Sequence, residues 1–250
     1  MKIDITLPTD LSEIPLTRYQ KFIEMKDKSN DEEFIAQKMI QIFCGIELKE
    51  VMNIQLKDLN ELIVHFTEVF KQKPKLRRHF KLGEYTFGFI PNLEHISFGE
   101  YVDIEHNLQD WKTYHKAMAV MFRPIKEKYK DKYSIIDYEP NEDMQELMKF
   151  APLDIAIAAS VFFYDIAKEL LNATLNYLQK ETKTMTNSMN STKEFNLEKN
   201  GNGIQASINA LKEMSQGLMQ LPNYNYLNVL PISHSKKKKT KLKPESLTEK

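Results

Sequence analysis

The residues best suited to chemistry in this chain are two basic runs that could neutralise phosphate groups. KQKPKLRRHFK at 71–81 holds six lysines or arginines, and KKKKTKLK at 236–243 holds six lysines. Such runs are typical of nucleic-acid contacts, and equally of a solvated helix end or a solubilising tail. The candidate contacts for a partner or for nucleic acid are Lys75, Arg77, Arg78, Lys81, Lys236, Lys237, Lys238 and Lys239.

A second group of polar residues lies between positions 94 and 106 and could be considered for metal binding. It comprises four carboxylates and two imidazoles: Glu94, His95, Glu100, Asp103, Glu105 and His106. Metal sites on helices use ligands one turn apart, yet no two of the six histidines are spaced as H-x-x-H or H-x-x-x-H. We therefore interpret this group as the solvated face of a helix, and we expect no metal and no cofactor.

Candidates for covalent catalysis are equally sparse. Cys44, the single cysteine, follows Phe43 in an apolar stripe, which favours a small buried hydrophobe over a reactive thiolate. No G-x-S-x-G, G-x-G-x-x-G or G-x-x-x-x-G-K-[ST] motif occurs, and a turn and a strand account for Gly83 and Gly88. We expect a protein that is not an enzyme. A lone cysteine also favours a reducing compartment.

The elements that position these groups are predicted to be mostly helices. Ser97 and Glu100 form an S-x-x-E capping box, and Gly45 is suited to a left-handed helix end. Apolar spacing predicts helices at about 17–27, 31–44, 47–53, 58–73, 98–107, 108–122, 142–150 and 153–181. RPI at 123–125 is expected to kink or end the helix before it.

One stretch has the alternation of a strand. In HFKLGEYTFGF at 79–89, a two-residue turn at Gly83-Glu84 would pair Phe80 with Phe87 and Arg78 with Phe89. Five apolar side chains then share one face, which suits a hairpin lying on a helical core. YSIIDY at 133–138 is interpreted as a lone strand. The predicted fold class is mainly α, a single helical domain with one small hairpin at about 78–89.

The composition changes near residue 182 and divides the chain. We expect a helical core domain at 1–181, a polar linker at 182–203, an amphipathic helix at 204–221 and a disordered basic tail at 222–250. The helix at 204–221 has one lysine and one glutamate, so it should pack on its own body or a partner rather than on a membrane.

Two features of the core argue against membrane insertion and secretion. The longest apolar run, IAIAASVFFY at 155–164, is shorter than the ~20 residues that span a bilayer. The start, MKIDITLPTD, lacks the apolar segment of a secretory signal. Charge is polarised as well, because residues 234–250 carry a net +5 in a chain whose formal net charge is zero.

Four phrases, LPTDLSEIPLTRYQKF at 7–22, FGFIPNLEHISFGEYVDIE at 87–105, AMAVMFRPI at 117–125 and MKFAPLDIAIAASVFF at 148–163, carry a family resemblance. Together they resemble uncharacterised proteins from the structural and assembly gene modules of tailed bacteriophages, some similar to tail assembly chaperones or minor virion components. The resemblance covers roughly residues 3–180 and includes no catalytic motif.

This resemblance implies a helical, non-enzymatic protein that binds other phage structural proteins, in the host cytoplasm or the virion. A homo-oligomer is a further option. The main alternative is a nucleic-acid-binding accessory protein that uses residues 71–81 and the lysine-rich tail.

Overall fold

A computed structural model of the protein describes residues 6–189, which form eight α-helices, two short 3₁₀ helices and a four-stranded antiparallel sheet. The mainly α fold class is therefore confirmed. The amphipathic helix expected at 204–221 and the tail expected at 222–250 lie outside the described residues, as does most of the expected linker.

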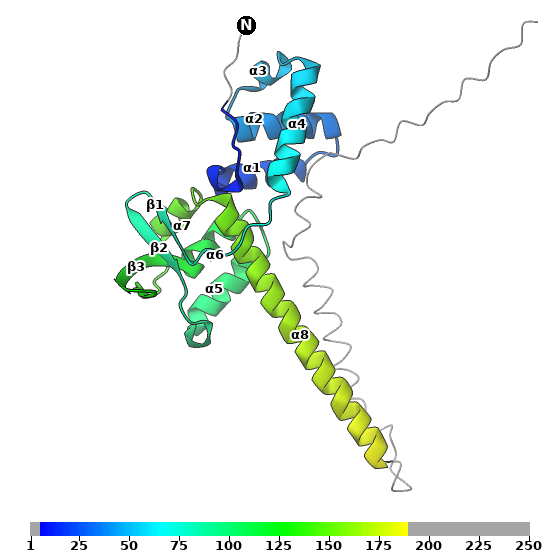
Figure 1. The fold of residues 1–250 in the computed structure, drawn as a ribbon, viewed down its shortest axis with the longest axis vertical. Helices are drawn as coiled ribbons and strands as arrows, with labels where there is room; N and C mark the ends of the chain where they lie inside the picture. The colour runs from blue at the N-terminus through cyan, green and yellow to red at the C-terminus, as the bar shows by residue number, and fades with distance from the viewer. Residues whose placement is uncertain (1–5, 190–250) are drawn as a thin grey trace, which may run out of the picture.

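Four helices form a group at the N-terminal end of the molecule (Figure 1). They are α1 (Leu16–Lys26), α2 (Glu32–Cys44), α3 (Leu48–Met52) and α4 (Leu56–Phe70). The Asp31 carboxylate accepts from the first backbone amides of α2, and Gly45 ends that helix with φ 70°. Their core is aromatic, because the Phe43 ring lies 5.2 Å from that of Phe22 and 5.1 Å from that of Phe70.

The predicted hairpin is present with the predicted register. Strands β1 (His79–Leu82) and β2 (Tyr85–Phe89) pair antiparallel, with Phe80 opposite Phe87 and Leu82 opposite Tyr85. The Phe89 amide donates to the Arg78 carbonyl at 2.7 Å, and Gly83 has the positive φ of 59° that the turn requires. Phe80, Phe87 and Phe89 are buried, whereas Tyr85 remains exposed.

This hairpin is only half of the sheet, whose other two strands were not predicted as a hairpin. β3 (Phe122–Tyr129) pairs with β2, and β4 (Lys132–Ile135) pairs with β3, giving the order β1-β2-β3-β4. The helix before RPI ends at Met121, one of the two predicted alternatives, and RPI itself lies within β3. There Pro124 is opposite Phe87, and its carbonyl accepts a hydrogen bond from the Ile136 amide. The segment expected to be a lone strand thus belongs to a second hairpin.

The helix predicted at 108–122 is also shorter than expected. α5 (Phe98–Leu108) continues to Leu108, a turn follows, and α6 (Tyr114–Met121) runs directly into β3. α7 (Glu142–Met148) and α8 (Leu153–Met189) complete the fold, and α8 extends beyond the end predicted at residue 181. Residues 182–189, expected to begin the linker, therefore form the last part of α8.

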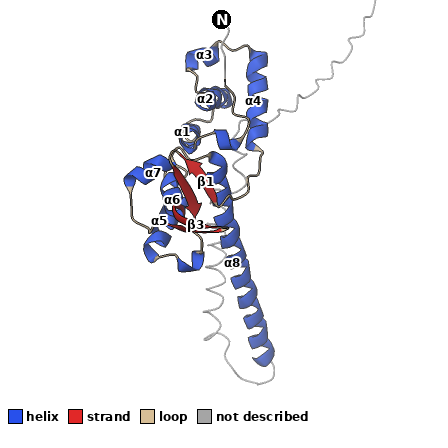
Figure 2. Ribbon diagram, turned by 60° about the vertical axis from the view of Figure 1, so that its left-hand side comes forward, coloured by secondary structure: helices blue, strands red, loops and turns tan. Residues whose placement is uncertain are grey.

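Contacts from α1 and from Ile14 just before it join the N-terminal helices to the rest of the molecule. The Leu16 amide donates to the Ala151 carbonyl at 2.9 Å, and the Leu153 amide donates to the Ile14 carbonyl at 2.8 Å. The Gln20 side-chain amide donates to the Trp111 carbonyl at 2.7 Å. Figures 1 and 2 show the result, with α1–α4 at one end of α8 and the sheet with α5, α6 and α7 beside its first half.

Candidate interaction surface

Helix α5 presents an exposed apolar surface, and the start of the helix is fixed by the predicted capping box. The Ser97 hydroxyl accepts from the Glu100 amide at 3.2 Å, while the Ser97 amide donates to the Glu100 carboxylate at 2.7 Å. These bonds satisfy the backbone amides of Ser97 and Glu100, which have no partner within the helix. The chain therefore turns into α5 directly after residue 97.

A buried ion pair then holds α5 against the sheet. Arg123 of β3 donates to Glu100 at 2.5 Å, and both side chains are largely buried. Burial alone raises the pKa of Glu100, but its bonds to Ser97 and the Arg123 guanidinium outweigh burial and hold that pKa below the ordinary value. Tyr138 donates to the Asp103 carboxylate and lies beneath the Arg123 guanidinium. These contacts give α5 a single orientation.

With one face anchored, the other face of α5 exposes apolar side chains. Phe98 is 82% exposed, Tyr101 51% and Val102 41%. Residues three and four apart lie side by side on a helix, so these three form one stripe, which we call the α5 stripe. Isolated exposed apolar residues are ordinary, whereas a contiguous set on an anchored helix indicates a binding surface.

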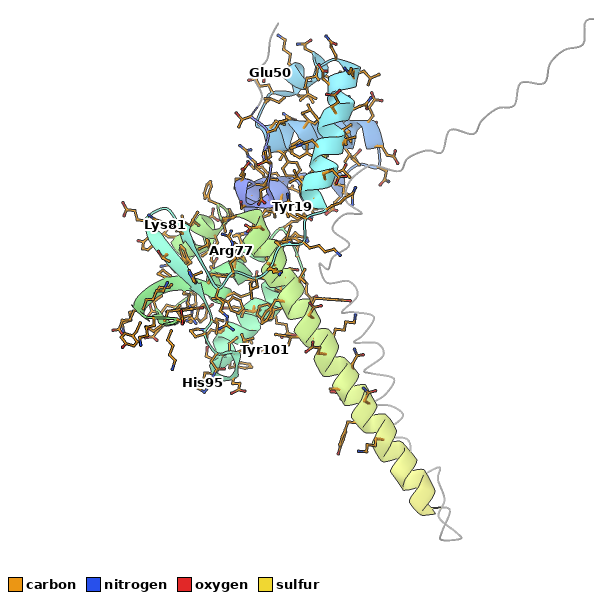
Figure 3. All side chains as sticks on the ribbon, viewed as in Figure 1. Tyr19, Glu50, Arg77, Lys81, His95 and Tyr101 are labelled. Carbon is orange, nitrogen blue, oxygen red and sulfur yellow. The ribbon has the colours of Figure 1, made fainter. Side chains whose placement is uncertain are left out.

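A shallow hollow continues the α5 stripe toward the end of the helix. It has a volume of about 340 Å³ and is lined by Val102, Glu105, His106 and Gln109. Glu105 is exposed one helical turn beyond Tyr101 and Val102 and adds an acidic group beside the stripe. The surface can therefore bury an apolar segment and pair with basic groups beside it. Figure 3 shows Tyr101 and His95 in the lower part of the body, whereas Lys81 lies higher, at its left edge.

The basic residues singled out in the sequence do not form one uniform patch. Lys75, Arg78 and Lys81 are exposed. Arg77 instead pairs with Asp154 at the start of α8, at 2.7 Å, so its charge helps to hold the loop before β1 onto that helix. Lys236, Lys237, Lys238 and Lys239 lie outside the described residues.

The acidic and histidine group at 94–106 is dispersed rather than convergent. Glu100 and Asp103 are engaged by Arg123 and Tyr138, as described above, while Glu105 and His106 line the hollow. Within residues 6–189, no group of three histidine, cysteine or acidic side chains is arranged to hold a metal ion. Burial raises the pKa of the Cys44 thiol to about 11, so this cysteine is protonated at neutral pH.

A second hollow, of about 610 Å³, lies where α1 meets the start of α2. Lys28 at its rim is bonded to Glu24 at 2.7 Å, and Lys38 lies over the Phe34 ring, 5.7 Å from its centre. Two of its three charged lining residues, Glu24 and Lys28, are thus paired with each other. The hollow is lined by Lys21, Glu24, Met25, Lys28, Ser29 and Phe34.

Comparisons with known proteins add no assignment, because no family model, no curated protein and no solved structure matches this chain. Of the helices in the described part of the chain, none combines the length and the apolar character that crossing a membrane requires. The α5 stripe itself was missed in the sequence, where its residues were counted only as helix. Phe98 and Val102 lie on the side of α5 opposite Ile104, and the burial of Ile104 in the structure identifies that side as the exposed one.

Proposed function

We propose that this protein is a non-enzymatic interaction protein that binds a partner protein through the α5 stripe. One observation carries the proposal, namely that Phe98, Tyr101 and Val102 are exposed together on a helix fixed by the buried Glu100–Arg123 pair. Aromatic side chains on a rigid element lose little conformational freedom on binding while they contribute large contact areas. Such residues are typical anchors of protein–protein interfaces.

The surroundings of the α5 stripe indicate the chemistry of the partner. Glu105, exposed beside Val102, favours lysine or arginine groups and repels phosphates, and Glu94 and Asp110 are exposed in the segments that flank α5. The partner segment is therefore expected to combine apolar anchors with basic flanking residues. An amphipathic helix laid across the stripe and the adjoining hollow would meet both requirements.

We further propose that the partner is a structural protein of a tailed phage and that binding serves assembly of the particle. Support comes from the resemblance described above, since the phrase at 87–105 runs through the first eight residues of α5 and contains the whole α5 stripe. A chaperone for tail proteins and a minor virion component both fit this proposal. Either would act in the host cytoplasm or remain in the virion.

Nucleic-acid binding remains a second candidate because Lys75, Arg78 and Lys81 are exposed in or beside β1. Exposed lysine and arginine side chains can neutralise phosphates without a specific binding pocket. Arg77 contributes less to such a surface, since Asp154 already neutralises it.

Site-specific photo-crosslinking in cells that naturally make the protein tests the first proposal. A photoreactive phenylalanine analogue at position 98 should capture a single partner polypeptide, identified by mass spectrometry. The same analogue at Tyr129, an aromatic residue of β3 that is 74% exposed, is the matched control and should capture none. Equal capture at both positions, or capture of nucleic acid alone at position 98, would refute the α5 stripe as a protein-binding surface.

A further inference from the structure

Helix α8 leaves the folded body partway along its length. Phe162 and Phe163 still contact the sheet, with ring centres 5.5 Å and 6.1 Å from that of Phe89. From Asp165 to Met189 the helix extends for about 38 Å, at ~1.5 Å per residue. In both views of Figures 1 and 2, no other helix or strand of residues 6–189 lies beside this part, which we call the α8 arm.

An apolar stripe continues from the core onto the α8 arm. Phe163 is followed by Ile166, Ala173 and Tyr177 at spacings that keep all four on one side of the helix. Ile166 is 37% exposed and Tyr177 63% exposed. Helices in water are stabilised mainly by packing of an apolar face, so an uncovered arm of this length is marginal by itself. We therefore expect another segment to pack against this stripe.

The chain itself supplies a segment of matching size and pattern. Residues 204–221 would form a helix of roughly 27 Å, at ~1.5 Å per residue, which fits within the length of the α8 arm. The connection 190–203 is polar, includes Gly201 and Gly203, and is longer than the ~2–8 residues that antiparallel helices need. The apolar residues of the segment recur at helical spacing: Ile204, Ile208, Leu211, Met214, Leu218 and Leu221.

We propose that residues 204–221 fold back along the apolar stripe of the α8 arm and form an antiparallel helical hairpin with it. Charge neither drives nor opposes this contact, because the arm has three acidic and three basic residues and the segment has one of each. A tethered segment is present at an effective concentration on the order of millimolar, so at micromolar protein it outcompetes a second copy of the chain. The hairpin is separate from the α5 stripe and does not depend on the function proposed above.

Hydrogen exchange of the full-length protein tests this proposal. We expect the double variant Leu211→Asp, Leu218→Asp to lower protection of the α8 arm by at least about tenfold, because aspartate replaces the residues that cover it. The matched control, Asn209→Asp with Gln216→Asp, adds the same charge on the opposite side of the segment and should change protection less than about threefold. Molar mass, measured on the same samples, should be that of a monomer.

A second variant, on the other helix of the proposed hairpin, keeps the proposal testable if the first variant does not fold. Tyr177→Asp alters only the exposed arm, and it should lower protection of residues 204–221 while leaving α1–α7 unchanged. Equal protection of the arm in all four proteins would overturn the proposal. Protection that disappears on dilution, together with the mass of a dimer, would also overturn it by showing that a second copy covers the α8 arm.

Discussion

Gly88 lies in β2, where Tyr133 of β4 covers the face of the sheet opposite to that of Phe87 and Phe89. The Tyr133 hydroxyl donates to the Phe89 carbonyl at 2.7 Å, so its ring crosses directly over the glycine. A Cβ at position 88 would lie 2.5 Å from Tyr133 Cε2 and 2.9 Å from Ile125 Cγ1. Glycine is required here because of close approach rather than because of an unusual φ.

Alanine substitutions at two glycines should therefore have opposite effects. Gly88→Ala should lower the free energy of unfolding by roughly 1–3 kcal/mol, since the ring or the strand must move. Gly99→Ala lies within α5, where the new Cβ would meet only Tyr138 at 3.9 Å, and it should raise stability by about 0.5–1 kcal/mol. Urea denaturation of the two variants measures both changes in the free energy of unfolding. A Gly88→Ala protein as stable as wild type would contradict the placement of Tyr133.

His115 of α6 should make stability depend on pH. Its ring is buried and its Nδ1 lies 3.0 Å from the Gln20 side-chain nitrogen. Burial, aided by nearby Lys149 and Lys116 and opposed by Glu146, lowers its pKa from the ordinary value of 6.5. Below pH 6.5 the unfolded chain therefore binds a proton that the folded chain does not, and the free energy of unfolding falls as the pH drops.

Replacing this histidine should flatten that dependence. His115→Gln removes up to about 1.4 kcal/mol of stability change per pH unit below pH 6.5, whatever its effect at neutral pH. Urea denaturation from pH 7.5 to pH 5 measures the slope for both proteins. Identical slopes would show that His115 does not titrate differently in the folded and unfolded states.

At the scale of elements, the turn between β3 and β4 carries the one non-glycine residue of the described chain with positive φ. Lys130 has φ 52°, a conformation that costs most L-residues about 1–2 kcal/mol. Lys130→Gly should therefore raise the free energy of unfolding by about 1 kcal/mol. Lys128→Gly, in the strand beside it, should lower it by about 0.5–1 kcal/mol. Thermal unfolding of both variants tests whether residue 130 has a positive φ. A loss of stability in Lys130→Gly would contradict that conformation.

The second hairpin also shows which strands could be predicted from the sequence and which could not. β1 and β2 were predictable because alternation and Gly83 act locally, within a few residues. β3 was not, because Pro124 and the lysines that follow are poor strand residues, and only pairing with β2 and β4 stabilises an extended chain there. The start of α5 was predictable from Ser97, but the exposed side of that helix depends on distant Arg123 and Tyr138.

At the scale of the whole molecule, the charges of residues 71–81 distinguish the two proposed functions. If α5 is the binding surface, the triple variant Lys75→Ala, Arg78→Ala, Lys81→Ala should change affinity for single-stranded or duplex DNA by less than about threefold. Titration with labelled oligonucleotides at 50 mM and 200 mM salt measures this. Tight binding that weakens steeply with salt and falls at least about tenfold in the triple variant would favour the nucleic-acid candidate instead.

The most direct test of the account is the affinity of the purified protein for the partner captured at position 98. Phe98→Asp should weaken that affinity by about 10–100-fold, because the anchor is lost and an added carboxylate repels basic flanking groups. Tyr129→Asp, the same change at an exposed aromatic residue away from α5, should leave the Kd within about threefold of wild type. Circular dichroism should show both variants folded. Equal affinity of the Phe98→Asp and wild-type proteins would contradict the claim that the α5 stripe is the binding surface.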